Sequence, residues 1–428
     1  MATIELGDLT DAPPAPITGR PLPRLHLRQL AVAAVTLALL VCGASAPAGE
    51  PGVRRLWSGA YQPENILAVT GDALYVQNDS QLVAYDLDDG DVRWAWRMDL
   101  DMLGIRPVLA GGLVLVQADN DTDDATEVSH TTIALDAATG AEIWRRSGGL
   151  RYDMIKEDSA LLVEYQAEDR MVMSRIGLAD GKPYWTLLVP GMREIVTDPA
   201  GRLLVRTSTG DVSVLRYSDG KREFSRRIMD GVEDPALGRY ISMSVDGGRL
   251  LVYHSRADDT YTTVHDLTTL DEVMRGEPGN GPLSGCGAVL CRFEDGRFVA
   301  VDPMTGKELW REPSSVVGLS MVADDKLMLD LSDGRMHVLV ESRTGRQLKA
   351  GLGGTALLDQ VTEDSLLLLR PSQLPAGLTA ITRIDMATGA GDLLGAIPLV
   401  PDPQTCQTVP GYLVCPGADR FFVTAVRR

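Results

Sequence analysis

Short apolar runs recur along the chain between residues 60 and 428. Each is only a few residues long, is rich in Leu and Val, and is bounded by Gly, Asp, Asn or Ser. Such runs predict β-strands, because a surface helix would need roughly 10–12 residues with a 3.6-residue apolar period. No segment after residue 60 carries that period, so we expect no crossover helices. The clearest runs are ALYVQ (73–77), GLVLVQA (112–118), ALLVEY (160–165), RLLVRT (202–207), RLLVYH (249–254), KLMLDL (326–331) and SLLLLR (365–370).

A phrase of eleven residues follows these runs at regular intervals. Its two fullest copies are ALDAATGAEIW (134–144) and AVDPMTGKELW (300–310). Eight copies of varying fidelity lie between Gly90 and Gly389, at a spacing of about 43 residues. With the apolar runs they divide the chain into units of four short antiparallel strands, a pattern typical of propeller blades. The other six copies lie at 84–94, 175–185, 214–224, 263–273, 338–348 and 383–393.

The composition of the phrase has a structural explanation. Asp302 can accept hydrogen bonds from the backbone amides of the turn that follows it. Gly306 supplies the positive φ that a tight hairpin needs. Trp310 then lies on the outer strand, where its ring covers the seam to the next blade and contributes about 2–3 kcal/mol through burial. We therefore expect the phrase to hold blades together and to carry no chemistry.

The pattern A-x-D-x-x-T-G-x-x-x-W resembles the tryptophan-docking motif of the pyrroloquinoline-quinone (PQQ)-type β-propeller repeat family. The resemblance covers 56–428 and implies a single all-β propeller of four-stranded blades. The family includes quinoprotein dehydrogenases, a propeller lipoprotein of the outer-membrane protein assembly machine and extracellular sensor domains, so the motif implies a fold and leaves the function open. The complete motif stands at Ala134, Asp136, Thr139, Gly140 and Trp144 and at Ala300, Asp302, Thr305, Gly306 and Trp310, and further docking tryptophans are Trp57, Trp94 and Trp185.

The two ends of the repeat region are expected to complete one blade together. RRLW (54–57) has the pattern of an outer strand with Trp57 in the docking position, and 412–428 has the pattern of inner strands without an outer partner. Pairing them closes the ring and removes free strand edges. Eight complete units and this split one make nine, whereas family members usually have eight blades. We predict eight, with nine as the alternative.

The residues before the repeats differ in character. The sequence predicts a disordered cytoplasmic tail over 1–29, a transmembrane helix or uncleaved signal anchor over 30–46, and a linker over 47–55. As a helix, 30–46 would span about 25 Å, the short end of the range for a bilayer. Arg residues precede the apolar segment and indicate that its N-terminal end lies in the cytoplasm.

Two alternatives remain for this segment. ASA (44–46) and APA (46–48) resemble cleavage sites of a signal peptide. Cys42 would carry the lipid of a lipoprotein, although Val41 stands where a small residue is expected. All three interpretations export the repeats, and the predicted localisation is a bacterial cell membrane crossed once.

The charge of the chain bears on its partners. The net charge of −18 argues against nucleic acid as a partner, because no basic stripe is present to contact phosphates.

Four cysteines follow the apolar segment in two close pairs, Cys286 with Cys291 and Cys406 with Cys415. Neither pair has the spacing of a zinc or thioredoxin motif. Outside the cytoplasm two disulfides are the preferred interpretation, and free buried thiols are the alternative.

The sequence offers one weak candidate for a metal site. Asp119, Asp121 and Asp123 match the first three ligands of an EF-hand loop. Asp124 stands where that loop needs Gly, and His130 stands where it needs Glu. An acidic loop is therefore preferred to a calcium site.

No other motif indicates catalysis. The chain has no GxSxG elbow, no phosphate-binding GxxxxGK[ST] loop, no adjacent cysteines and no histidines at metal-ligand spacing. We expect no catalytic, cofactor-binding or metal-binding residue. The preferred function is a membrane-tethered, extracytoplasmic scaffold or sensor that binds an unidentified protein on one face of the propeller. The alternative is a quinoprotein-type dehydrogenase with PQQ in the funnel.

Overall fold

The computed structural model describes residues 52–427 except 63–64, 79–80, 98–101, 109–110, 121–128, 167–169, 229–239, 257–258, 277–281, 324, 332–335 and 359–363. The predicted tail (1–29), the apolar segment (30–46) and most of the predicted linker (47–55) lie outside this set. Within the set, no helix is long and apolar enough to cross a membrane.

The described residues form an all-β structure, as predicted. They contain 35 strands and two short 3-10 turns, η1 (Tyr152–Met154) and η3 (Pro403–Thr405), and no α-helix. All strand pairs are antiparallel, and most sheets hold four strands in chain order. Four such units are β2 (Ile66–Val69), β3 (Ala73–Asn78), β4 (Gln81–Asp86) and β5 (Val92–Arg97); β6 (Met102–Val108), β7 (Leu113–Asn120), β8 (Ser129–Asp136) and β9 (Glu142–Ser147); β10 (Gly149–Arg151), β11 (Ser159–Gln166), β12 (Arg170–Gly177) and β13 (Pro183–Pro190); and β14 (Met192–Thr197), β15 (Arg202–Thr207), β16 (Asp211–Arg216) and β17 (Arg222–Arg227).

One sheet has seven strands because a long strand belongs to two units. The first half of β25 (Glu308–Ala323) pairs with β24, and its second half pairs with β26. The described residues therefore contain nine four-stranded units, the higher of the two predicted counts. The remaining strands are β18 (Tyr240–Asp246), β19 (Arg249–Arg256), β20 (Asp259–Asp266) and β21 (Glu272–Arg275); β22 (Ser284–Cys286), β23 (Val289–Glu294), β24 (Arg297–Val301), β26 (Lys326–Leu331), β27 (Met336–Glu341) and β28 (Gln347–Gly353); and β29 (Thr355–Leu358), β30 (Ser365–Pro371), β31 (Leu378–Asp385) and β32 (Gly391–Pro398).

The unit around 263–273 explains why the count is difficult from sequence. Leu270 replaces the glycine of the phrase there and still adopts a left-handed backbone, with φ of 57°. Met274 takes the place of the tryptophan and packs on Gly306 of the next unit. Burial of Leu270 in the core offsets a backbone conformation that is unfavourable for a branched side chain.

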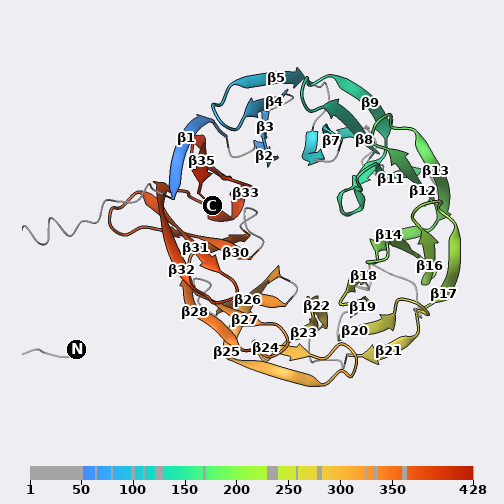
Figure 1. Cartoon of the computed structure of the whole chain (residues 1–428). Coiled ribbons are helices and arrows are strands. Elements are labelled where there is room, and N and C mark those ends of the chain that lie inside the picture. The colour runs from blue at the N-terminus through green and yellow to red at the C-terminus, as the bar shows by residue number, and fades with distance from the viewer. Residues whose placement is uncertain are drawn as a thin grey trace, which may run out of the picture. The chain divides into compact units, whose positions relative to one another are not determined.

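The ends of the described chain share one sheet, as the sequence predicts. β1 (Val53–Ala60) pairs with β35 (Arg420–Val426), and β34 (Tyr412–Pro416) and β33 (Gln407–Val409) complete the sheet. β1 lies beside β35 in Figure 1. The strand begins at Val53, within the predicted linker, because the Val53 side chain is buried against the preceding unit.

The hydrophobic core lies between the units. In the described part of the chain, nine clusters of buried apolar side chains each draw on two neighbouring units. Leu369 and Leu413 belong to the cluster that joins β29–β32 to the split unit. Phe421 and Leu74 belong to the cluster that joins the split unit to β2–β5. Each sheet is therefore apolar on both faces and depends on two neighbours.

Candidate functional site

The tryptophan of the phrase contacts the next unit. Trp310 lies on β25 opposite Ala300, whose small side chain leaves room beside the ring. Its Nε1–H donates to the carbonyl oxygen of Ser342, with an N–O distance of 2.7 Å. The ring lies against Gly345, where an added Cβ would come within 2.5 Å of it. Glycine is required here for two reasons. A side chain at this position would collide with the Trp310 ring, and the φ of 67° is a conformation that favours glycine.

The same contact recurs at the other predicted docking tryptophans. In each case the indole N–H donates to the carbonyl three residues before the turn glycine of the next unit, and the ring covers that glycine. The contacts are Trp57 with Leu87 (2.9 Å), Trp94 with Ala137 (2.8 Å), Trp144 with Leu178 (2.6 Å) and Trp185 with Tyr217 (2.8 Å), over Gly90, Gly140, Gly181 and Gly220.

The aspartates of the phrase cap their own turns. Asp302 Oδ1 accepts from the backbone N–H of Thr305 at 2.7 Å, and Asp136 Oδ1 accepts from that of Thr139 at 2.8 Å. The threonine hydroxyls donate to the same oxygens. These hydrogen bonds hold the pKa of both carboxyl groups below the ordinary value, chiefly through the Thr305 amide for Asp302 and the Thr139 hydroxyl for Asp136. A carboxylate held ionised in this way is unsuited to act as a general acid near neutral pH.

Both predicted cysteine pairs lie at disulfide distance. Cys286 and Cys291 lie on the two strands of the β22–β23 hairpin, diagonal to each other, with their Cα atoms 5.9 Å apart. Cys406 and Cys415 join the segment before β33 to β34, with a Cα–Cα distance of 4.2 Å. The second pair lies in the split unit.

The weak calcium candidate is largely outside the described residues. Asp121 and Asp123 fall in the gap at 121–128, and Asp119 lies on β7 opposite His130. Elsewhere in the described ranges, no three His, Cys, Asp or Glu side chains gather closely enough to hold a metal ion.

Two buried histidines of β19 and β20 share one hydroxyl group. Thr263 Oγ1 lies 2.9 Å from His265 Nε2 and 3.2 Å from His254 Nε2. His265 Nδ1 lies 3.1 Å from the carbonyl oxygen of Leu270, which can only accept, so Nδ1 carries the proton. Neutral His265 then accepts from Thr263 through Nε2, and the hydroxyl oxygen is left to accept from His254.

This arrangement predicts acid sensitivity. Burial lowers the pKa of His265 from about 6.5, against smaller opposing effects from Leu270 and Glu272. The native state therefore resists protonation that the unfolded chain accepts, and stability present above pH 6.5 is lost as the pH falls through the lower native value. We expect the free energy of unfolding to fall as the pH is lowered from 6.5 toward the native pKa of His265, by at most about 1.4 kcal/mol per pH unit for this proton. Urea titrations of wild type and His265→Asn measure it, and an equally steep decline in the variant would contradict the assignment.

Two ends of each unit can be distinguished by their connections. At the turn end, the glycine turn of the phrase joins the third strand to the outer strand. At the hairpin end, a hairpin such as the one after Gln166 joins the second strand to the third. The tryptophan contacts bring the turn ends of neighbouring units together, so the hairpin ends of those units lie together on the opposite side.

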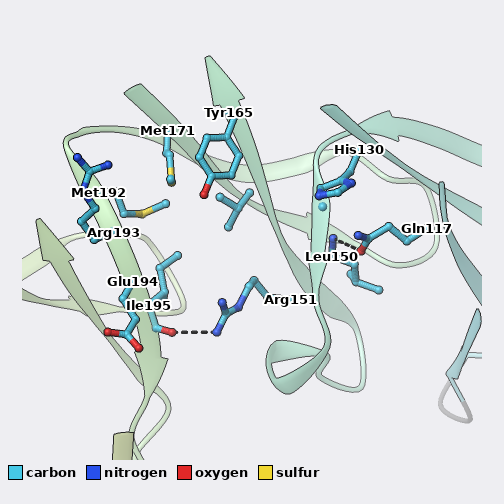
Figure 2. A pocket seen from close by; sticks show the side chains of 12 residues that line it. Gln117, His130, Leu150, Arg151, Tyr165, Met171, Met192, Arg193, Glu194 and Ile195 are labelled. Atoms are coloured by element: carbon cyan, nitrogen blue, oxygen red, sulfur yellow. Dashed lines mark hydrogen bonds between the residues drawn. The ribbon is translucent and has the colours of Figure 1, made fainter. Parts of the chain in front are cut away.

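A cavity of about 200 Å³ lies near the hairpin end, lined by β10–β12, by the first strand of the following unit and by Gln117 and His130 of the preceding unit. Figure 2 shows Tyr165 and Met171 on one side of it and Met192 and Arg193 on the other. Met171 and Met192 are buried, whereas the Tyr165 side chain is 59% exposed. The cavity therefore has an apolar floor and an open, polar rim.

Charged side chains beside this cavity link three units. Arg151 Nη2 donates to the carbonyl oxygen of Ile195 at 2.9 Å, as Figure 2 shows. Glu194 accepts from the backbone N–H of Met243 at 2.8 Å and forms an ion pair with Arg206 at 3.3 Å. These bonds hold the first strands β10 and β14 to the units that follow them.

A similar bridge joins the split unit to the first complete one. The Gln407 side chain donates to the carbonyl oxygen of Leu67 at 2.6 Å and accepts from the backbone N–H of Val69 at 3.2 Å. Neither this bridge nor the cavity was predicted. Their residues stand outside the repeated phrase, and the sequence gives no signal that brings them together.

Comparisons with known proteins agree with this fold. A family model described as outer membrane protein assembly factor BamB matches residues 48–173 and 168–351. A eukaryotic initiation factor structure superposes with a TM-score of 0.54 at 10% identity, over 87% of this chain and 92% of that one. BamB from Moraxella catarrhalis gives 0.45 at 14% identity, over 87% and 99%. A europium-containing methanol dehydrogenase gives 0.41 at 11% identity, over 88% and 94%.

No curated protein matches the chain. At these identities the similarity to the initiation factor concerns the fold alone, and the two structures with lower scores add no argument. The family model, by contrast, matches well over half of the sequence. The chain therefore belongs to the family of PQQ-like β-propeller repeat proteins whose model is described as outer membrane protein assembly factor BamB.

Proposed function

We propose that residues 52–428 form a closed propeller of nine blades that serves as a non-catalytic scaffold or sensor and binds a partner protein through the hairpin end. One observation carries the binding surface. Large apolar side chains from five units are exposed at the hairpin end, and we infer that they form one contiguous apolar patch, the kind of surface that marks an interaction site. They are Tyr165, Leu188, Tyr240, Phe293, Val317, Leu374 and Leu399.

The nine core clusters support the closed ring. They form an unbroken series in which every unit packs on the next, and the split unit packs on both the last and the first complete unit. A closed ring leaves no face of a unit uncovered, which suits a rigid platform that presents loops to a partner.

Site-specific photocrosslinking tests the binding surface. A photoreactive amino acid at Tyr240 or Phe293 is expected to yield a discrete protein adduct in native membranes. Val92 is the matched control, because it is similarly exposed (58% against 56% for Tyr240) but lies on an outer strand near the turn end. Adducts of equal yield from Val92, or none from Tyr240 and Phe293, would contradict the proposal.

The dehydrogenase alternative predicts an enzymatic activity that a non-catalytic scaffold lacks, so a simple assay distinguishes the two. The full chain in detergent, incubated with PQQ, Ca²⁺ and an alcohol or sugar, is expected not to reduce a redox dye. Saturable reduction that depends on the substrate would replace the scaffold by a quinoprotein enzyme.

We further propose that 30–46 anchors the propeller in a membrane with 1–29 in the cytoplasm. The Arg residues before the apolar segment support this orientation. Mass spectrometry of the protein isolated from membranes is expected to find the tail intact. A mature N-terminus near Pro47 or Gly49 would show a cleaved signal peptide instead.

A further inference from the structure

We propose that β13 accepts an extended segment of the partner as an additional antiparallel strand, with an acidic residue of that segment at Arg222. The proposal rests on the proposed function and names one contact of the partner, because Leu188 of β13 belongs to the apolar side chains exposed at the hairpin end. β13 is the last strand of its sheet and lies beside β12 (Figure 1), so in the described part of the chain its other edge is open.

β13 lacks the charge that protects other edge strands. Every other outer strand of the described units carries at least one charged side chain, whereas the sequence of β13, PYWTLLVP, has none. Its Tyr184 and Leu188 side chains are 57% and 47% exposed. An exposed apolar edge strand without charge offers its unpaired backbone groups to a strand of another chain. The prolines at its two ends confine such pairing to the residues between them.

Thr186 and Leu188 direct their backbone groups to the open edge. In the units before and after, the residue four positions beyond the docking position, Gly148 or Ile228, donates its backbone N–H inward to its own sheet. The equivalent residue of β13 is Val189. Because the direction of these groups alternates along an antiparallel strand, the N–H and C=O groups of Thr186 and Leu188 point outward. They are the hydrogen-bonding groups that an added strand would use.

A groove accompanies β13 on the side of the next unit. A cavity of about 350 Å³ lies between β13 and β15–β17, lined by the buried Val205 and Leu215 and by Leu187 and Val189. Side chains of an added strand opposite Leu187 and Val189 enter this side, because opposite residues of a strand pair share a face. The volume is more than twice the roughly 150 Å³ of an engineered cavity that accepts benzene, so two apolar side chains fit.

Arg222 supplies an unpaired positive charge at this groove. Among the described residues it is the one charged side chain that lines the cavity, and it forms no ion pair or side-chain hydrogen bond. The acidic residues nearest to it in the sequence are engaged elsewhere, since Asp219 and Glu223 pair with Arg216 at 3.2 Å and 3.5 Å. A free guanidinium beside an apolar groove favours an apolar segment that carries a carboxylate.

Comparison among the units shows that this charge is exceptional. In three units the residue two positions after the turn residue is Glu, and it forms an ion pair with the Arg three residues later. These pairs are Glu142 with Arg145 (2.8 Å), Glu272 with Arg275 (2.6 Å) and Glu308 with Arg311 (2.8 Å). In the unit of β14–β17 the same two positions are Arg222 and Ser225. The position that is neutralised within those three units is therefore left with a free positive charge here.

Selection from a library of random nonapeptides displayed on phage tests the inference, with the full chain in detergent as bait. We expect enriched peptides to carry apolar residues at alternate positions, with Asp or Glu continuing the same alternation. In fluorescence anisotropy, Thr186→Pro and Arg222→Glu are each expected to weaken the selected peptides at least about fivefold. Thr186→Pro removes an outward N–H, which an edge strand tolerates.

Each variant has a matched control on another outer strand. Arg145→Pro makes the first change at the equivalent position of β9, and Arg97→Glu makes the second at an exposed position of β5. Both controls are expected to bind the peptides as wild type does. Peptides that bind Thr186→Pro and Arg222→Glu as tightly as wild type, or a library that yields no enriched peptide, would overturn the strand addition.

Two further measurements separate this inference from its alternatives. Self-association of the wild type in analytical ultracentrifugation that Thr186→Pro abolishes would identify a second copy of the chain as the occupant and overturn the partner segment. If Thr186→Pro and Arg222→Glu keep the wild-type yield of crosslinks at Tyr240, the partner binds the hairpin end without β13, and only this inference fails. Peptides that bind β13 as expected, in a protein that gives no crosslinks in membranes, would leave the edge site standing and remove the scaffold role.

Discussion

Replacing Trp310 with Ala is expected to lower the free energy of unfolding by about 3–5 kcal/mol. The substitution empties the seam over Gly345 and leaves the buried carbonyl of Ser342 without its indole donor. It also removes a ring packed on Phe298, at a centroid distance of 5.1 Å. The loss falls on the contact between two units, so both are expected to unfold at lower urea concentration. Urea denaturation followed by circular dichroism measures the effect.

Two variants make the measurement specific. Trp310→Phe keeps most of the ring and loses the hydrogen bond, so we expect a smaller loss that includes about 1 kcal/mol for that bond. Leu309→Ala changes the neighbouring residue, which is 42% exposed, and is expected to cost no more than about 0.5 kcal/mol. A cost for Trp310→Ala as small as that for Leu309→Ala would show that the ring does not hold the units together.

Removing β1 is expected to destabilise the protein more than any single substitution. A chain that begins at Tyr61 lacks the strand that pairs along β35 and the Trp57 contacts with Leu87 and Phe421. The loss of Trp57 alone is expected to cost about 3–5 kcal/mol, and the exposed edge of β35 adds to it. A chain that begins at Gly52 keeps the strand and is the control.

Rescue in trans distinguishes loss of the strand from general misfolding. A peptide covering 52–60 is expected to raise the unfolding midpoint of the shortened chain in a concentration-dependent way, because it binds only the native state. Equal midpoints for the chains that begin at Gly52 and Tyr61 would show that β1 contributes nothing to the fold.

The strand pattern and the split unit could be predicted because each follows from a physical requirement that particular residue types meet. A tight turn requires glycine, and the contact between two units requires a large flat ring. An outer strand without inner neighbours of its own, the one that carries Trp57, requires inner strands from elsewhere in the chain. The unit that contains Leu270 was harder to count, since the left-handed conformation there is held by burial and not by residue type.

The cavity had no sequence signal for a different reason. Tyr165, Met192 and Arg193 come from positions that vary from unit to unit, and each alone resembles an ordinary strand residue. Only the packing of one unit on the next brings them to the same rim. The repeat pattern predicts only the residue positions that all units share, whereas this candidate site is lined by positions that differ between units.

Amide hydrogen exchange of the wild-type chain tests the central claim, that contacts between successive units, completed by β1, make one closed structure. In a closed ring the amides of β35 open only when the whole protein unfolds, and we expect them to exchange as slowly as those of β12. Exchange in β35 that is about tenfold or more faster than in β12, with β12 unchanged, would show that the split unit opens by itself and that the ring is not closed.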